Sequence, residues 1–251
     1  MTNVKNFLEN IRKSIFAENE NYQRLELPTP PKVWQDDNIA NIANAKQSED
    51  ELLLLETFCQ NLEKLNGESV LCDNFDNLIL QIAKILRESK SDEIKIMISS
   101  HLLVRRVAEN LQAVLDQLSE SSDAKTHLTF YSEPPEDDLN LVELSSCDFG
   151  FVSAEALLAD TGSGVFRANS RFERLAIYLP PVSIVVVGRS KLERNLPEAW
   201  KYLNTEIKNQ NSGEFVIVTG PSRTADIEKI LILGVHGPKR VLFMIYKDAN
   251  E

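Results

Sequence analysis

Short apolar runs alternate with longer amphipathic segments in the first half of this chain, and this alternation restricts the fold more than any other feature. Strands are predicted at Ser69–Cys72, Ile94–Ser99 and Thr126–Tyr131, where β-branched and apolar residues cluster. Helices are predicted between them, at Leu78–Leu86 and Leu102–Leu118. Because strands separated by helices form right-handed βαβ units, this order predicts an α/β fold with a mostly parallel sheet flanked by helices.

The pattern changes after residue 131. Phe149–Val152, Ala156–Ala159 and Val165–Ala168 are short apolar pieces separated by turn residues. The segment Asp160–Gly164, between the last two pieces, has the composition of a tight turn. The sequence therefore predicts a β-hairpin inserted into the parallel fold.

The C-terminal part predicts a strand, a turn and a helix in quick succession. Phe215–Thr219 is an apolar and β-branched run, which predicts a buried strand, and Gly220-Pro221 ends it. Ser222 or Thr224 is then placed to cap a helix that ends at Gly234. The remaining predicted elements are the strands Ser183–Val187 and Val241–Tyr246 and the helix Leu196–Ile207.

This C-terminal stretch supplies the first set of candidate site residues. Open α/β sheets bind ligands at the carboxyl ends of their strands, and free N–H groups at a helix start suit an anion. His236 lies in a glycine-flanked loop, where it is placed either for acid–base catalysis or for fastening its own loop. The predicted ligand contacts are Gly220, Ser222, Arg223, Thr224 and Gly237, with His236 as a catalytic candidate.

The Asp160–Gly164 turn supplies the second set. It carries one carboxylate, two hydroxyls and two glycines that allow close backbone approach to a ligand. Asp160 is a catalytic candidate, and Thr161, Gly162 and Ser163 are predicted ligand contacts. The alternative is a hairpin turn with a purely structural role.

Two further residues carry weaker indications. His101 follows Ser99-Ser100 at the end of a predicted strand, so it is placed at a sheet edge. Glu155 lies near the Asp160 turn, and a glutamate is a possible nucleophile in transfer reactions. No motif identifies it as one, which favours a structural role.

Composition and motifs exclude several classes of protein. A net charge of −11 argues against nucleic-acid binding, which needs basic patches. Cys59, Cys72 and Cys147 form no CxxC pair, so neither an iron–sulfur cluster nor a zinc site is expected. No nucleotide-binding glycine motif is present, and no metal or cofactor is expected. The N-terminus lacks a signal peptide and no apolar run is long enough for a membrane span, which predicts a cytoplasmic protein.

The N-terminal part is expected to be separate from the alternating core. Val4, Phe7, Leu8, Ile11 and Ile15 give an amphipathic helix, and the polar segment 19–38 contains three prolines. We therefore expect an N-terminal helix and linker at residues 1–45 and one α/β domain at residues 46–251.

The motifs resemble those of a known family. The segment TGPSRTADIE, followed by GVHGP, resembles the C-terminal signature of LUD-domain proteins, in particular the lactate utilization protein C family. Ala159–Ser163 resembles the family's Ala-Asp/Glu-Thr-Gly-Thr turn, with serine replacing the last threonine. Leu179-Pro180-Pro181 followed by Ser183–Val187 resembles a third element. The resemblance covers roughly residues 68–246.

This resemblance implies a fold similar to the NagB/RpiA/CoA-transferase group. It also implies an accessory role in the oxidation of L-lactate to pyruvate, alongside iron–sulfur partner proteins, and a small anionic ligand is expected. Two alternatives stay open: a stand-alone enzyme acting on a sugar phosphate or an acyl-CoA, and a purely structural or regulatory subunit. The sequence does not decide whether the chain is catalytic.

Overall fold

The structure is a computed structural model that describes residues 48–89, 91–119, 126–135, 138–209, 213–225, 231–234 and 236–248. The predicted N-terminal helix, around Val4–Ile15, and the linker at 19–38 lie outside these residues. The domain boundary near residue 45 therefore stays a prediction.

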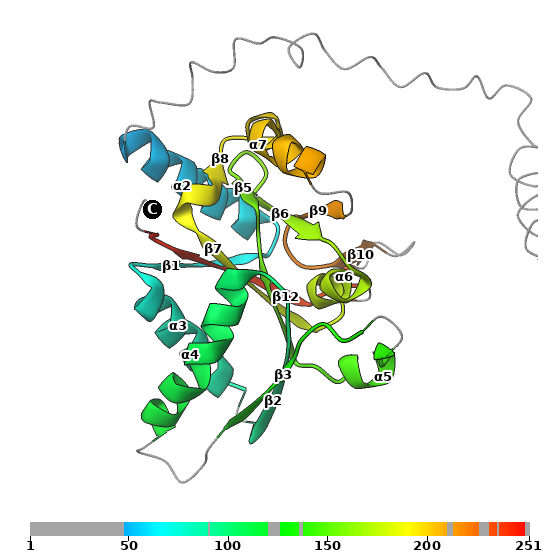
Figure 1. The fold of residues 1–251 in the computed structure, drawn as a ribbon. Helices are drawn as coiled ribbons and strands as arrows, with labels where there is room; N and C mark the ends of the chain where they lie inside the picture. Colours follow the sequence, from blue (N-terminus) through cyan, green and yellow to red (C-terminus); the bar gives the residue numbers. More distant parts are fainter. Residues whose placement is uncertain are drawn as a thin grey trace, which may run out of the picture. The chain divides into compact units, whose positions relative to one another are not determined.

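A six-stranded parallel sheet forms the centre of the described fold (Figure 1). Its strands lie in the order β1-β12-β7-β4-β2-β3, and every neighbouring pair is parallel. Their bounds are β1 (Glu68–Cys72), β2 (Glu93–Ile98), β3 (His127–Tyr131), β4 (Phe149–Ser153), β7 (Val182–Gly188) and β12 (Arg240–Tyr246). The predicted parallel α/β fold is confirmed.

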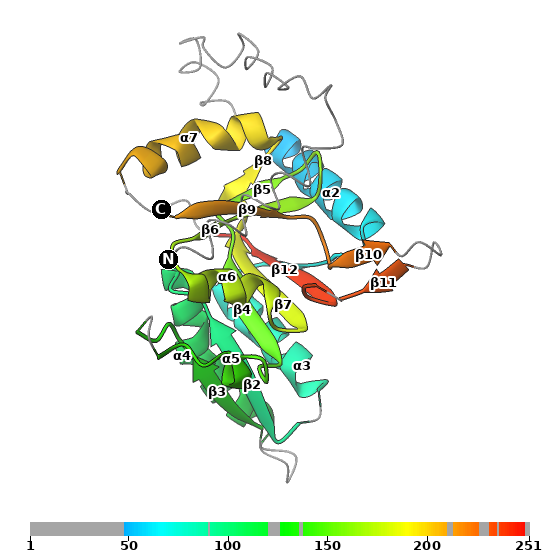
Figure 2. The same cartoon turned by 90° about the vertical axis from the view of Figure 1, so that its right-hand side faces the viewer.

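A smaller four-stranded sheet lies beside the parallel one (Figure 2). Its order is β8-β5-β6-β9, and the turn at Asp160 joins β5 to β6 in an antiparallel hairpin, as predicted. The bounds are β5 (Ala156–Leu158), β6 (Ser163–Ala168), β8 (Leu192–Glu193) and β9 (Glu214–Val218). The hairpin thus forms the centre of a second sheet.

Helices cover both sheets. The short 3-10 helix η4 (Arg189–Lys191) connects β7 to β8, and α5 is a single turn. Figure 1 shows α3 and α4 on one face of the parallel sheet, with α2, α6 and α7 on the side of the smaller sheet. The helices are α2 (Ser48–Lys64), α3 (Phe75–Arg87), α4 (Leu102–Ser119), α5 (Leu141–Leu144), α6 (Arg171–Tyr178) and α7 (Leu196–Asn209).

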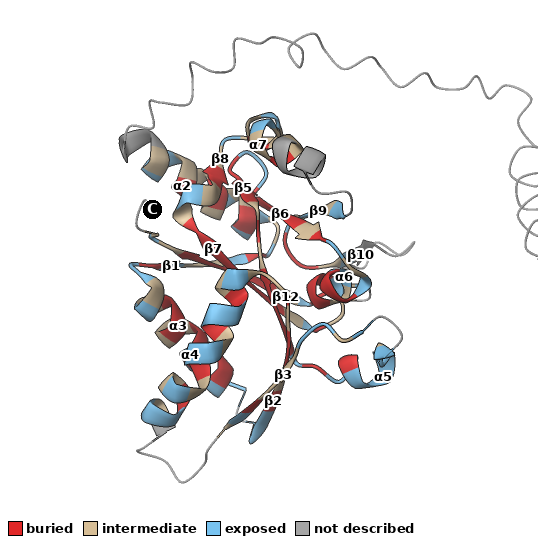
Figure 3. Ribbon diagram, in the orientation of Figure 1, coloured by how far each residue is buried: buried red, intermediate tan, exposed pale blue. Residues whose placement is uncertain are grey.

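The inner strands of the parallel sheet, β12, β7, β4 and β2, are buried on both faces, which explains why they are nearly continuous apolar runs. Along β12, Leu242 and Met244 face the core beneath α3 and α4, whereas Phe243 faces the core shared with α2 and the smaller sheet. Side chains of β7 alternate in the same way, with Ile184 on the first side and Val185 on the second. Figure 3 shows this burial along the central strands.

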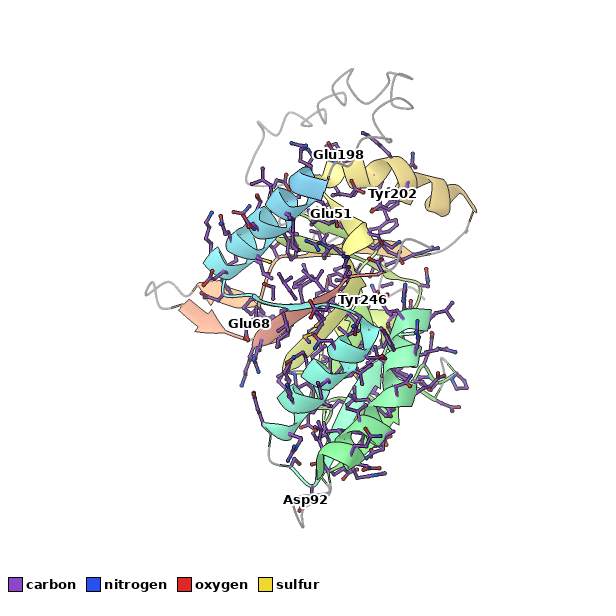
Figure 4. The ribbon with its side chains drawn as sticks, turned by 90° about the vertical axis from the view of Figure 1, so that its left-hand side faces the viewer. Glu51, Glu68, Asp92, Glu198, Tyr202 and Tyr246 are labelled. Atoms are coloured by element: carbon purple, nitrogen blue, oxygen red, sulfur yellow. The ribbon has the colours of Figure 1, made fainter. Side chains whose placement is uncertain are left out.

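We call the side of the parallel sheet where its strands begin the amino edge, and the side where they end the carboxyl edge. At the amino edge, the Arg240 guanidinium donates two hydrogen bonds to Glu68, at 2.6 and 2.7 Å, which joins β12 to β1. Tyr246 ends β12 at the carboxyl edge. Figure 4 labels Glu68 and Tyr246, which mark these two edges. In the described part of the chain, no helix is long and apolar enough to cross a membrane.

The structure corrects two predictions in the C-terminal part. Phe215–Thr219 is not a buried parallel strand: β9 pairs antiparallel with β6, and the Ile217 side chain is 48% exposed. Within the predicted helix after Ser222, the described residues instead form two strands, and β10 (Arg223–Ala225) pairs antiparallel with β11 (Leu231–Leu233). A short segment of apolar residues is compatible with a helix or with a strand. Here the two segments pair with each other, and this pairing favours strands.

Candidate functional site

The signature loops lie at the amino edge of the parallel sheet, opposite to the predicted carboxyl edge. Gly220 packs so closely on the residues before β1 that a methyl group there would lie 2.9 Å from the Leu65 carbonyl oxygen. The Ser222 N–H donates to the Pro238 carbonyl, just before β12, at 2.9 Å. The prediction of a carboxyl-edge position was wrong because β9 belongs to the smaller sheet.

The Asp160 turn docks on the last turns of α2. The Asn61 side chain donates to the carbonyl oxygens of Ala159 and Asp160, at 2.9 and 3.1 Å. Gly162 has a φ of 65°, and a methyl group there would lie 2.3 Å from the Leu62 nitrogen. A glycine is therefore required at this position both for its conformation and for the close packing on α2.

A chain of hydroxyl groups connects this turn to β9. The Ser163 hydroxyl donates to Thr161 Oγ1 at 2.8 Å and lies 2.7 Å from Thr219 Oγ1. Ser163 is almost fully buried, whereas Thr161 and Thr219 are exposed. The structure thus brings Thr161 and Ser163 of the first motif next to the residue that begins the second.

These groups line a cavity of about 530 Å³, which we call the hairpin-turn pocket. Lys64 supplies an ammonium group at its rim and donates to Asn61 Oδ1 at 3.0 Å. The pocket is open and its surface is mainly apolar, with a small number of polar groups, as in most small-molecule sites. Its lining residues are Asn61, Lys64, Leu65, Leu158, Asp160, Thr161, Ser163, Leu196, Ile217 and Thr219.

The other predicted site residues do not line this pocket; they are Gly162, Gly220, Ser222, Arg223, Thr224, His236 and Gly237. A methyl group on Gly237 would lie 3.0 Å from Ser222 Cβ, so these two loops touch. Arg223 and Thr224 lie on β10, and the side chains of Arg223 and His236 are exposed. Because β10 replaces the predicted helix, the helix-start argument for anion binding at Arg223 is wrong.

A second set of polar residues lies at the carboxyl edge, between β2 and β4. The chain leaves β2 toward β3 and leaves β4 toward β7, so connections from these adjacent strands run in opposite directions. A ligand crevice is expected at such a switch point. A cavity of about 60 Å³ lies here, which we call the carboxyl-edge cavity. Its polar lining consists of Ser99, Ser100, His101, Ser153, Glu155, Arg167, Asn169 and Glu173.

His101 caps helix α4 in this cavity. The Leu103 N–H donates to His101 Nδ1 at 3.2 Å, and the Arg105 N–H donates to the His101 carbonyl at 3.1 Å. Burial lowers the pKa of His101, and Lys191 lowers it further, whereas Glu155 and Glu173 act in the opposite direction. The ring is therefore neutral at pH 7, and with Nδ1 accepting, its proton lies on Nε2.

Glu173 is a carboxylate buried at the start of α6. The Ser100 hydroxyl donates to its Oε1, and the Asn169 N–H donates to its Oε2 at 2.6 Å. The Glu173 N–H in turn donates to Ser170 Oγ at 3.2 Å. These bonds hold the carboxylate in place and satisfy it in a site where an unpaired charge would be costly.

The sequence predictions missed this arrangement. Ser170 and Glu173 form the spacing of a capping box, which would have predicted α6. His101 was placed at a sheet edge from its sequence, but its neighbours Glu155 and Glu173 come from other elements. Only the topology brings them together.

The described thiols are structural in character. Cys72 and Cys147 are buried, and burial raises the pKa of each thiol to about 11, with Asp73 and Asp148 as secondary causes. Cys59 on α2 is half-buried. Within the described ranges, no three His, Cys, Asp or Glu side chains are grouped so as to hold a metal ion.

Comparison with known proteins identifies the family. The LUD domain profile matches residues 55–246. The chain belongs to the LUD domain family. This assignment confirms the resemblance inferred from the two motifs.

Curated relatives agree with the assignment. A lactate utilization protein C from Exiguobacterium sp. (strain ATCC BAA-1283 / AT1b) is 28% identical over 99% of this chain and 97% of its own length. Another, from Macrococcus caseolyticus (strain JCSC5402), is 28% identical over 50% of this chain and 55% of its own length. The chain thus spans about half the length of the second relative.

A solved structure supports the fold. A DUF162 family protein from Deinococcus radiodurans superposes with a TM-score of 0.50 at 11% identity, covering 78% of this chain and 98% of that one. At this identity the likeness concerns the fold alone. That protein shares the α/β fold expected from the sequence.

Proposed function

We propose that this protein is a cytoplasmic accessory component of L-lactate utilization that acts with iron–sulfur partner proteins. The observation that carries this proposal is the similarity to a lactate utilization protein C along 99% of the chain. Because its described cysteines are buried or lie on separate elements, electron transfer is assigned to the partners.

We further propose that the hairpin-turn pocket binds a small anion. Lys64 and the hydroxyls of Thr161 and Thr219 are the donors at its surface. Gly162 brings the backbone of the turn close to α2, which fixes the position of Asp160 at the pocket rim. The adjoining loops, with Gly220, Ser222, Arg223, Thr224, His236 and Gly237, are proposed to close over the anion from the side of β10.

The role is tested by deleting the gene and measuring growth on L-lactate, with pyruvate as the matched carbon source. We expect growth on L-lactate to fail, growth on pyruvate to continue, and the full-length gene to restore the loss. Normal growth of the deletion strain on L-lactate would contradict the role.

The partners are tested by anaerobic purification of the tagged protein from lactate-grown cells. We expect iron and acid-labile sulfide to copurify with separate polypeptides and to be released with them at high salt. A tagged protein that elutes alone, in cells that depend on it for growth on L-lactate, would remove the partner part of the proposal.

A further inference from the structure

The hydroxyl of Ser99 is the starting point for a second ligand site. Ser99 is 8% exposed, and its Oγ has no hydrogen-bond partner among the residues that the structure describes. A buried hydroxyl without a partner destabilises the fold, and such groups are rare in native proteins. The missing partner is therefore expected in the adjoining carboxyl-edge cavity.

The size of that cavity limits what it holds. A water molecule requires about 10–15 Å³ on the same measure, so the 60 Å³ available here accommodates roughly four to six waters. A molecule of about six non-hydrogen atoms is of that size. His101 also lines a neighbouring cavity of about 950 Å³.

The polar groups of the cavity are of two kinds. Donors lie on the β2 side, where the Ser99 hydroxyl and the Nε2–H of neutral His101 lie at the start of helix α4, whose dipole favours an anion. An acceptor lies on the β4 side, where Glu155 follows the strand. The Glu155 backbone is fixed by bonds from its N–H to Val165 and from Tyr202 to its carbonyl.

We propose that the carboxyl-edge cavity binds a small 2-hydroxy carboxylate. The carboxylate oxygens accept from the Ser99 hydroxyl and from His101 Nε2–H, and the 2-hydroxyl group donates to the Glu155 carboxylate. This inference rests on the proposed function, because lactate utilization supplies a ligand of this class, and it names a site separate from the hairpin-turn pocket.

Charge balance supports this orientation of the ligand. Lys191 and the start of α4 attract a carboxylate, and both lie near His101. The negative charge of Glu173 repels a bound carboxylate, but the two oxygens of Glu173 already accept hydrogen bonds from Ser100 and Asn169. Glu155 would repel a carboxylate and bind a hydroxyl, so the hydroxyl must face β4.

The test is titration of the full chain with L-lactate, using propionate, which lacks the 2-hydroxyl, as the matched ligand. We expect L-lactate to bind at least about tenfold more tightly, since a hydrogen bond to a charged group contributes about 1.5–3 kcal/mol. The ¹⁵N signal of His101 Nε2 is expected to shift as lactate is added. Equal binding of the two acids, or no binding of L-lactate at millimolar concentration, would overturn the proposal.

Variants locate the site. Ser99→Ala and His101→Asn are each expected to weaken L-lactate binding by about three- to thirtyfold, and Asn at position 101 retains an acceptor that caps α4. Ser91→Ala, an exposed serine at the opposite end of β2, is the matched control and should leave binding unchanged. If Ser163→Ala, in the hairpin-turn pocket, weakens binding as much as Ser99→Ala does, the site is wrong. Growth on L-lactate is measured for the same variants. A variant that loses L-lactate binding but still grows on L-lactate separates this inference from the proposed function.

Discussion

The hydroxyl oxygen of Ser163 lies 2.7 Å from that of Thr219. This contact joins the β5–β6 hairpin to the end of β9, so it connects two motifs that are 56 residues apart in the chain. It also fixes the wall of the hairpin-turn pocket that both residues line.

A double-mutant cycle measures this contact. Ser163→Ala and Thr219→Val are each expected to lower the unfolding free energy by about 0.5–1.5 kcal/mol, because each removes one hydroxyl of the pair. The double variant should cost less than the sum, since the second change removes a group that has already lost its partner. Urea unfolding of the four proteins provides the values, and strict additivity would show that the hydroxyls do not interact.

Gly162→Ala is expected to destabilise the fold strongly. A left-handed backbone costs a residue with a side chain about 1–2 kcal/mol, and the new methyl group would also clash with the backbone of α2 at Leu62. Asp160→Ala is the control, because the bonds at Asp160 that hold the turn are made by its backbone. Thermal melts of both variants test this, and similar melting temperatures would contradict the close packing described here.

The lowered pKa of His101 predicts a loss of stability in acid. The unfolded chain, with a histidine pKa of about 6.5, binds the proton before the folded chain does. Stability is therefore lost as the pH falls below about 6.5. His101→Asn removes this loss, so the difference in unfolding free energy between the two proteins should change sharply below pH 6.5 and stay constant above it. A constant difference down to pH 5 would show that the folded histidine titrates normally.

The buried thiols should resist alkylation. With a pKa of about 11, about one in a thousand Cys72 or Cys147 side chains is ionised at pH 8, and both are also shielded from solvent. We expect iodoacetamide to modify Cys59 first under native conditions and all three thiols after denaturation, as followed by peptide mass spectrometry. Because the pKa values of these thiols are raised in the folded protein, we also expect the free energy of unfolding to fall above about pH 9.

Removal of residues 1–45 should leave a folded domain. The buried residues of the three described cores lie between Leu55 and Ile245, on elements that begin at α2. We expect the truncated protein to melt cooperatively at a temperature close to that of the full chain. Aggregation of the truncated protein, or a broad melt, would mean that the N-terminal segment completes a core.

Local sequence patterns predicted most of the parallel sheet because its inner strands are buried on both faces and so are apolar along most of their length. Ile94–Ser99 and Ser183–Val187 are such runs, and β2 and β7 follow them closely. The same patterns failed after Gly220, where short segments pair with each other in β10 and β11. Isoleucines and leucines at helical spacing do not reveal such pairing.

The candidate sites were predictable only in part. The turn from Asp160 to Gly164 was identified because its composition is local, and its hairpin followed from that. The carboxyl-edge cavity depends on residues from three parts of the chain: His101 after β2, Glu155 after β4 and Glu173 on α6. Their proximity follows from strand order, which spacing along the sequence does not contain.

The pairing of β1 with β12 has a consequence for synthesis on the ribosome. Glu68 and Arg240, which join these strands, are separated by 172 residues, and β12 lies between β1 and β7 in the sheet. A growing chain thus holds β1 without its neighbour until nearly all of the protein has been translated, with the apolar edge of β7 also unpaired. Chaperones that bind exposed strands would act during this interval, and a stop codon shortly before Arg240 would leave a gap between β1 and β7.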